Sequence, residues 1–329
     1  MRRRLIFVVS ILVSLAFLYL TLRDVPLAEV WAGIQRAEIG WVILGFIGVF
    51  GAQATRAVRW CGLLDNKIRF AQSFHILNIM MMLNQVPLRI GEVARVFLAT
   101  RYNVPLVTAA TSIVVERLID VVIVVVLLAI SVARLPNVPP LVAQTVTLFG
   151  AGAVITFVVL ITFARYPTFA HRILTWIETR LPFLKRINLV KRLEEVLDGL
   201  KPLTHWRSAV HALVWTVIAW TVSLATFYAI NRALNISGID LILFAMMGVP
   251  LVAFSLAIPV TVAALGPFQG AVRVAGDALG IPVVDSATLG FLFHGVTVIS
   301  YAVMGVIGLL TLGVSLRDVM PADQTSEET

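Results

Sequence analysis

The residues best suited to bind an anion lie in one short stretch of the chain, residues 84–95. Its helix-breaking and charged members are Pro87, Arg89, Gly91, Glu92 and Arg95, and apolar segments flank it on both sides. A charge at the centre of a bilayer costs about 2.5–3.5 kcal/mol even on insertion-based scales. Broken backbone at that depth is tolerated only where protein or water surrounds it. The stretch is therefore predicted to face protein or a water-filled cavity and not lipid.

A second group of charges interrupts the long apolar run 106–133. Glu116 and Asp120 are one helical turn apart and share a face, whereas Arg117 points elsewhere. Buried charges need partners. Candidate partners earlier in the sequence are Arg89, Glu92 and Arg95. Two interpretations stay open: a structural ion-pair lock between the two segments, or a lock that also frames a functional site.

Arg56 and Arg59 form a third cationic group, near the end of the apolar segment 40–60. They are three residues apart and so share one helix face. Their side chains either extend to the headgroups at the cytoplasmic surface or contact a lipid phosphate. Both interpretations stay open.

The composition identifies an all-α polytopic membrane protein. Hydrophobic residues make up 59% of the 329 residues, charged residues 13%, and the mean hydropathy is +0.95. We explain the net charge of +8 by membrane topology and not by nucleic-acid binding, because the basic residues lie beside apolar runs. Cys61 is the single cysteine and the histidines form no H-E-x-x-H motif, so no metal site and no cofactor are predicted.

We predict about six full spanning helices and two re-entrant hairpins broken by Pro and Gly, which makes eight to ten hydrophobic helices. The spans are placed at 5–22, 40–60, 106–133, 141–164, 208–230 and 283–316, and the hairpins at 73–100 and from 241 onward, where Pro250 and Pro259 cut the apolar run. Residues 1–318 form a single transmembrane domain, and 319–329 are a disordered polar tail.

The basic residues orient this domain. Arg2, Arg3 and Arg4 place the N-terminus in the cytoplasm, and the predicted number of spans returns the C-terminus to the same side. Residues 165–207 are rich in Lys and Arg, with apolar residues at helical spacing, and are predicted to form an amphipathic segment on the cytoplasmic membrane surface.

An internal repeat is predicted from landmarks that recur with an offset of 177 residues. Glu92 aligns with Gln269, Pro105 with Pro282, and Arg117 with His294. The repeat halves are about 40–134 and 208–317, and they run in opposite directions. Inverted repeats with broken helices are the architecture of alternating-access transporters, whose half-helix N-termini attract anionic groups. A helix that begins near Gly91 would add its free N–H groups to the neighbouring guanidinium groups, which suits a phosphate.

The ordered motifs also resemble a known family, the membrane domain of the lysylphosphatidylglycerol synthase/flippase family. They are Arg56-x-x-Arg59-Trp60, Pro87-x-Arg89-x-Gly91-Glu92-x-x-Arg95, Glu116-Arg117-x-x-Asp120, and Pro259 with Gly266-Pro267-Phe268-Gln269. The chain departs from the family at Gln269, because many members have Gly-Gly-x-Gly followed by Glu in this region. That departure places in question any role that needs a second carboxylate.

The resemblance implies movement of a phospholipid or polyprenyl-phosphate-type lipid between the leaflets of a prokaryotic plasma membrane. The substrate-binding residues expected from the charged motifs and the repeat are Arg56, Arg59, Arg89, Glu92, Arg95, Glu116, Arg117, Asp120, Gln269 and Arg273. The chain ends about twelve residues after the last apolar run. The aminoacyltransferase domain of two-domain members is therefore expected to be absent, and a separate cytoplasmic lipid-modifying enzyme is a possible partner.

Three functions are compatible with these patterns. The first is a lipid flippase that is not an enzyme and, because the sequence has no G-x-x-x-x-G-K-[ST] motif, runs downhill or on an ion gradient. Protonation of Glu92, Glu116 or Asp120 is a candidate coupling step. The second is a membrane enzyme that uses these carboxylates as acid, base or Mg²⁺ ligands, although neighbouring arginines would compete with the cation. The third is an accessory scaffold for a glycosyltransferase or lipid synthase.

Overall fold

The computed structural model describes residues 2–135, 140–180, 197, 204–256 and 261–316. Every regular element in these ranges is a helix, so the predicted all-α polytopic membrane fold is confirmed. The predicted tail 319–329 and most of the second half of the amphipathic segment lie outside the described residues.

The first half of the chain ends with a long helix that follows a broken hairpin. Its elements are α1 (Arg2–Leu22), α2 (Leu27–Gln35), α3 (Ile39–Leu63), α4 (Phe70–Leu83), the 3₁₀ turn η1 (Pro87–Arg89), α5 (Ile90–Thr100) and α6 (Leu106–Arg134). The break predicted at 84–95 is shorter than expected, because α5 begins at Ile90 and includes Glu92 and Arg95. Helix α2 was not predicted, since its sequence is short and mixes charged with apolar residues.

The second half repeats the order of a long helix, two short helices and a long helix. After α7 (Pro140–Arg165) and α8 (Pro167–Arg180), these four helices are α10 (Trp206–Ala233), α11 (Leu241–Leu256), α12 (Pro267–Ala278) and α13 (Val283–Leu312). Helix α11 continues through the buried Pro250, where the sequence suggested a cut. Helix α13 ends at Leu312 and is capped by Gly313, whose φ of 61° is in the left-handed region that glycine adopts readily.

Three of the described helices are long and apolar enough to cross a membrane alone: α3, α10 and α13. The number rises to five if each sharply bent pair, α1 with α2 and α7 with α8, forms one span. Helix α6 has the length, but Glu116, Arg117 and Asp120 interrupt its apolar surface. The total of about six spans stays a prediction.

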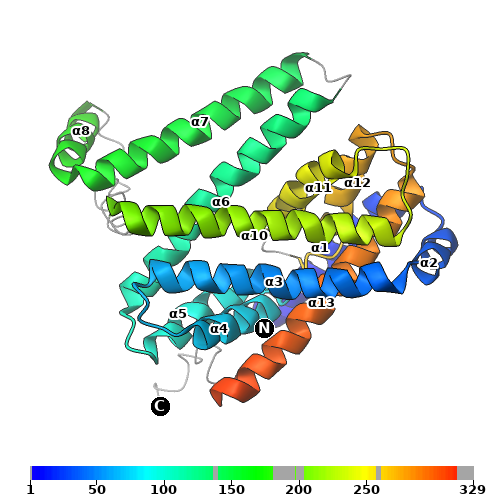
Figure 1. The fold of residues 1–329 in the computed structure, drawn as a ribbon, viewed down its shortest axis with the longest axis horizontal. Coiled ribbons are helices and arrows are strands. Elements are labelled where there is room, and N and C mark those ends of the chain that lie inside the picture. Colours follow the sequence, from blue (N-terminus) through cyan, green and yellow to red (C-terminus); the bar gives the residue numbers. More distant parts are fainter. Residues whose placement is uncertain (1, 136–139, 181–196, 198–203, 257–260, 317–329) are drawn as a thin grey trace.

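Helices α3 and α10 form the most extensive helix pair and run antiparallel (Figure 1). Gly45, Gly48 and Gly51 follow one face of α3 and pack against α10. A Cβ atom added to Gly48 would lie 2.3 Å from the hydroxyl oxygen of Thr226. Small residues at such spacing allow helix backbones to approach closely within a membrane.

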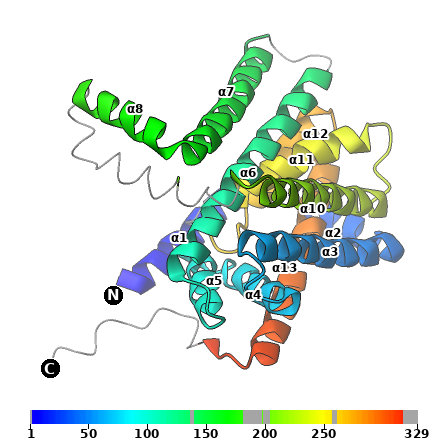
Figure 2. The same cartoon turned by 60° about the vertical axis from the view of Figure 1, so that its left-hand side comes forward.

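One short helix of each half packs against a long helix of the other half. Helix α4 contacts α13, and α11 contacts α6. Helix α7 contacts α6 and continues into α8, and both views show this pair leaning away from the other helices (Figure 2). The two breaks meet directly, because the N–H of Ala263 donates a hydrogen bond of 2.8 Å to the carbonyl oxygen of Gln85.

Aromatic side chains form the core of the second half. Phe227 contacts Phe244 and Phe293 in edge-to-face geometry, with ring centroids 5.2 and 5.3 Å apart. Phe268 extends the cluster to α12 at 5.5 Å from Phe293. Such pairs add about 0.5–1.5 kcal/mol each beyond the burial of their area. This cluster holds α10, α11, α12 and α13 around the inner end of α12.

Candidate functional site

A cavity of about 340 Å³ lies among helices of both halves. Among the described residues, the charged ones that line it all come from the first half: Arg56, Arg59, Arg89, Arg95, Glu116, Arg117 and Asp120. The second half contributes uncharged side chains, among them Val249, Phe268, Phe293 and Tyr301. The cavity therefore has one charged wall and one largely apolar wall.

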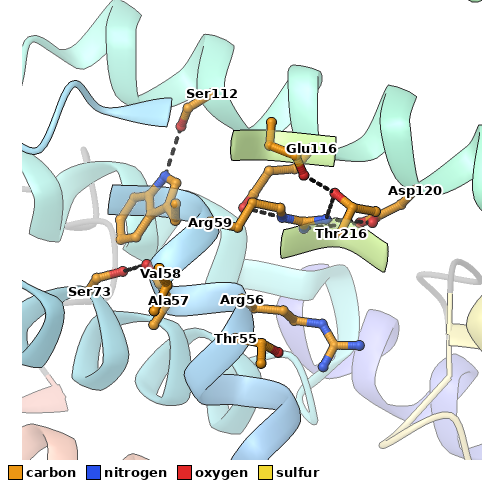
Figure 3. Close-up of polar contacts among 12 residues, drawn as sticks. Thr55, Arg56, Ala57, Val58, Arg59, Ser73, Ser112, Glu116, Asp120 and Thr216 are labelled. Carbon is orange, nitrogen blue, oxygen red and sulfur yellow. Dashed lines mark hydrogen bonds and ion pairs between the residues drawn. The ribbon is translucent and has the colours of Figure 1, made fainter. Parts of the chain in front are cut away.

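Arg59 joins two carboxylates on the charged wall. Its Nη1 lies 2.7 Å from Asp120 Oδ1, and its Nε lies 3.3 Å from Glu116 Oε1 (Figure 3). Thr216 of α10 accepts a further hydrogen bond of 3.1 Å from the same guanidinium group. Arg59 is 3% exposed, so the interpretation that it extends to the cytoplasmic headgroups is wrong. The reason is that this part of α3 packs between α6 and α10.

Two more ion pairs connect α5 with α6. Arg95 Nη2 lies 2.6 Å from Glu116 Oε2, and its guanidinium carbon lies 4.0 Å from the centre of the Trp60 ring. Glu92 pairs with Arg117, which is more exposed. The predicted lock between the hairpin and the long helix is thus present. Arg59 was missed as a partner of Glu116 and Asp120, since it is distant from both in sequence and only packing brings them together.

Arg56 lies on the same helix face as Arg59 but has different partners. Its guanidinium group donates to Ser223 Oγ at 3.0 Å and to Gln53 Oε1 at 3.5 Å. Figure 3 shows its side chain pointing away from the group formed by Arg59, Glu116 and Asp120. No carboxylate of the described residues lies within ion-pair distance of Arg56.

Arg89 stands at the break itself and lines the cavity. It precedes α5 with φ 51° and ψ 45°, a left-handed backbone conformation that is uncommon outside glycine. Its side chain is half-buried, and within the described part of the chain it makes no hydrogen bond and no ion pair. Backbone strain of this kind costs about 1–3 kcal/mol and clusters at functional sites.

Gln269 and His294 occupy the positions that align with Glu92 and Arg117. Gln269 Oε1 accepts a hydrogen bond from the N–H of Gly266, so its amide nitrogen donates to His294 Nδ1 at 2.9 Å. His294 Nε2 then donates to the carbonyl oxygen of Ala263 at 2.8 Å. The pair in the second half is therefore uncharged, and its hydrogen bonds define the neutral tautomer of the histidine.

The ten predicted site residues divide into three groups. Seven line the cavity: Arg56, Arg59, Arg89, Arg95, Glu116, Arg117 and Asp120. Glu92 is connected to the cavity through Arg117. Gln269 is fully buried behind the lining, and Arg273 lies elsewhere, where it donates to the carbonyl oxygen of Thr21 and faces Asp24 at 3.9 Å.

Several lining residues were not predicted as site residues. Tyr301, Ser223 and Asn84 face the cavity. Tyr301 and Ser223 sit within long apolar runs, where nothing in the local pattern marks them. His294 had a signal, since the repeat aligns it with Arg117. Among the described residues, no group of three or more His, Cys, Asp or Glu side chains is arranged to hold a metal ion.

Residues 7–305 match the family model described as the lysylphosphatidylglycerol synthase TM region. No curated protein matches the chain, and no solved structure does. The match covers the part of the chain that contains the cavity and both of its walls.

Proposed function

The chain belongs to the family of the lysylphosphatidylglycerol synthase transmembrane region, a membrane domain associated with lipids, and we propose that it moves a phosphate-containing lipid headgroup between the two leaflets. The observation that carries the proposal is the cavity with one charged and one apolar wall. Arginine side chains suit a phosphate, and the apolar wall suits the adjoining glycerol and the first carbons of the acyl chains.

The size of the cavity fits a headgroup and not a whole lipid. Ligand pockets occupy about 300–1,000 Å³, and this cavity of about 340 Å³ is at the lower end of that range. The acyl chains of the substrate would then stay in the bilayer while the headgroup passes through the protein. The substrate is a phospholipid or a polyprenyl-phosphate-type lipid.

The two halves act as an inverted repeat that moves around the cavity. The order of helices supports this part of the proposal, since each half has a long helix, two short helices and a long helix preceded by proline, Pro105 or Pro282. The hairpins are re-entrant, and alternating contact between them opens the cavity to one leaflet at a time. A lipid or ion gradient supplies the energy.

We place the protein in a prokaryotic plasma membrane with both termini in the cytoplasm, as a single transmembrane domain of residues 1–318. The amphipathic helix α8 supports a position at the membrane surface, because Phe169 and Trp176 are exposed among basic residues. A separate cytoplasmic lipid-modifying enzyme would meet the protein on this side.

An enzymatic role has less support. A metal-dependent or acid–base mechanism needs free carboxylates, but Glu92, Glu116 and Asp120 are each held by an arginine. The experiment that tests the flippase function also tests the scaffold function, since a scaffold would not move lipid.

Lipid movement in proteoliposomes tests the proposal. Headgroup-labelled phospholipid, purified protein and a membrane-impermeant quencher report movement between leaflets, with and without a pH gradient. We expect movement by the wild-type protein, strong loss in Arg89→Ala, and wild-type rates in the control Arg273→Gln, which lies outside the cavity. Absence of movement by the folded wild-type protein under all conditions would contradict the proposal.

A further inference from the structure

The charges around the cavity do not balance. Within the described residues, five arginines line the cavity: Arg56, Arg59, Arg89, Arg95 and Arg117. Three carboxylates pair with three of them, because Asp120 and Glu116 hold Arg59 and Arg95, and Glu92 holds Arg117. Two positive charges are left, at Arg56 and Arg89.

These two arginines differ from the other three in what surrounds them. Arg59 and Arg95 are at most 3% exposed and are fixed by carboxylates on α6. Arg56 has only the neutral partners Ser223 and Gln53, and Arg89 makes no hydrogen bond or ion pair with any described residue. Cations that a protein leaves without an acidic partner in a low-dielectric cavity favour the entry of an anion.

The two carboxylates that line the cavity, Glu116 and Asp120, are not free to bind a cationic headgroup. Both oxygens of Asp120 accept hydrogen bonds from Arg59, and Glu116 forms ion pairs with Arg59 and Arg95. An amine that entered the cavity would meet the field of two uncompensated arginines and would have to displace an existing ion pair. A phosphate meets no such competition.

We infer that the cavity selects headgroups of net negative charge and that Arg56 and Arg89 are the residues that bind the phosphate. This inference rests on the proposed function for its link to transport. It excludes lysylphosphatidylglycerol, whose two amines make the headgroup net cationic, as the preferred substrate of this chain. The network of Arg59, Arg95, Glu116 and Asp120 is then a structural support for the charged wall.

The test uses three lipids with identical acyl chains, namely phosphatidylglycerol, phosphatidylethanolamine and lysylphosphatidylglycerol, in the same proteoliposomes. We expect phosphatidylglycerol to move at least about tenfold faster than lysylphosphatidylglycerol, a ratio that corresponds to about 1.4 kcal/mol. Arg56→Gln and Arg89→Gln should each slow the movement of phosphatidylglycerol and lower the ratio of its rate to that of lysylphosphatidylglycerol. Arg273→Gln should leave this ratio unchanged. Melting temperature and elution volume of each variant confirm folding.

A binding measurement separates the inference from the transport function. Short-chain phosphatidylglycerol and phosphatidylethanolamine are titrated into the detergent-solubilised wild-type protein. The signal is the tryptophan fluorescence, to which Trp220 at the cavity wall contributes. Selective binding of the anionic lipid without transport would overturn the proposed function and support the inference. Transport without charge preference, or equal rates in wild type and both arginine variants, would overturn the inference and leave the proposed function standing.

Discussion

The N–H of Ala263 donates a hydrogen bond of 2.8 Å to the carbonyl oxygen of Gln85, which joins the broken segment of the first half to that of the second. Ala263 also receives the hydrogen bond from His294 at its own carbonyl oxygen. One residue therefore connects the break between α4 and α5 with the long helix α13. Any movement of one hairpin relative to the other has to break or shift this contact.

A disulfide between these breaks should stop lipid movement. Residues joined by a backbone hydrogen bond lie close enough for the Cα separation of about 4.4–6.8 Å that a disulfide needs. We expect the pair Gln85→Cys and Ala263→Cys, in a Cys61→Ala background, to lose movement on oxidation and to regain it with a reductant. Each single-cysteine variant is the control. Full activity of the oxidised pair would show that the contact persists through the transport cycle.

Glu116→Gln should destabilise the fold strongly. The substitution keeps the shape of the side chain but leaves Arg59 and Arg95 facing an uncharged group in a buried place. Removing one partner of a buried ion pair costs about 3–5 kcal/mol. Unfolding in mixed detergent micelles measures the change, and the exposed Asp65→Asn, expected within about 0.5 kcal/mol of wild type, is the control. Equal stability of both variants would show that the network contributes little.

Gly91→Ala should separate α5 from α4. An added Cβ atom would lie 2.1 Å from the carbonyl oxygen of Met80 and 2.6 Å from Asn84 Oδ1, and the backbone oxygen cannot rotate away. Forced overpacking costs about 1–3 kcal/mol. The matched control is Gly295→Ala in α13. A Cβ atom added there would meet no neighbouring atom within 4 Å, so this substitution should be neutral or stabilising. A comparison of the two melting temperatures decides between the close contact and a general intolerance of alanine.

Gln269 and His294 should show coupling in a double-mutant cycle. Gln269→Glu alone buries a carboxylate beside a neutral imidazole nitrogen that accepts a hydrogen bond, so it should destabilise the protein. Adding His294→Arg supplies the cation that the first half has at Arg117. We expect the double variant to be more stable than the sum of the single changes by about 1–3 kcal/mol. Additive effects would show that the two halves do not share this pairing.

The sequence predicted the local features of the fold better than the distant contacts. Hydrophobic runs predicted the long helices, and the runs predicted to begin at 106 and 283 begin where α6 and α13 do. The partners of Glu116 were predicted only from residues near in sequence, so Arg95 was found and Arg59 was not. That second contact depends on how α3 packs against α6, which no local pattern encodes.

The repeat illustrates the same limit at the candidate site. The alignment paired Glu92 with Gln269 and Arg117 with His294, and in both halves the aligned residues contact each other. The sequence could not show that Gln269 lies behind the cavity lining, because the side-chain position depends on the hydrogen bond to Gly266. Nor could it separate the paired arginines from Arg56 and Arg89.

The charges of α6 also have a consequence for biosynthesis. Each of Glu116, Arg117 and Asp120 opposes entry of the helix into lipid by about 2.5–3.5 kcal/mol at its centre. Their partners Arg59, Glu92 and Arg95 lie on α3 and α5, which the ribosome makes before α6. We expect α3 and α5 to remain beside the translocation channel until α6 has left the ribosome. A chain without Arg59 or Arg95 would then fail at membrane integration and reach the quality-control proteases before it could fold.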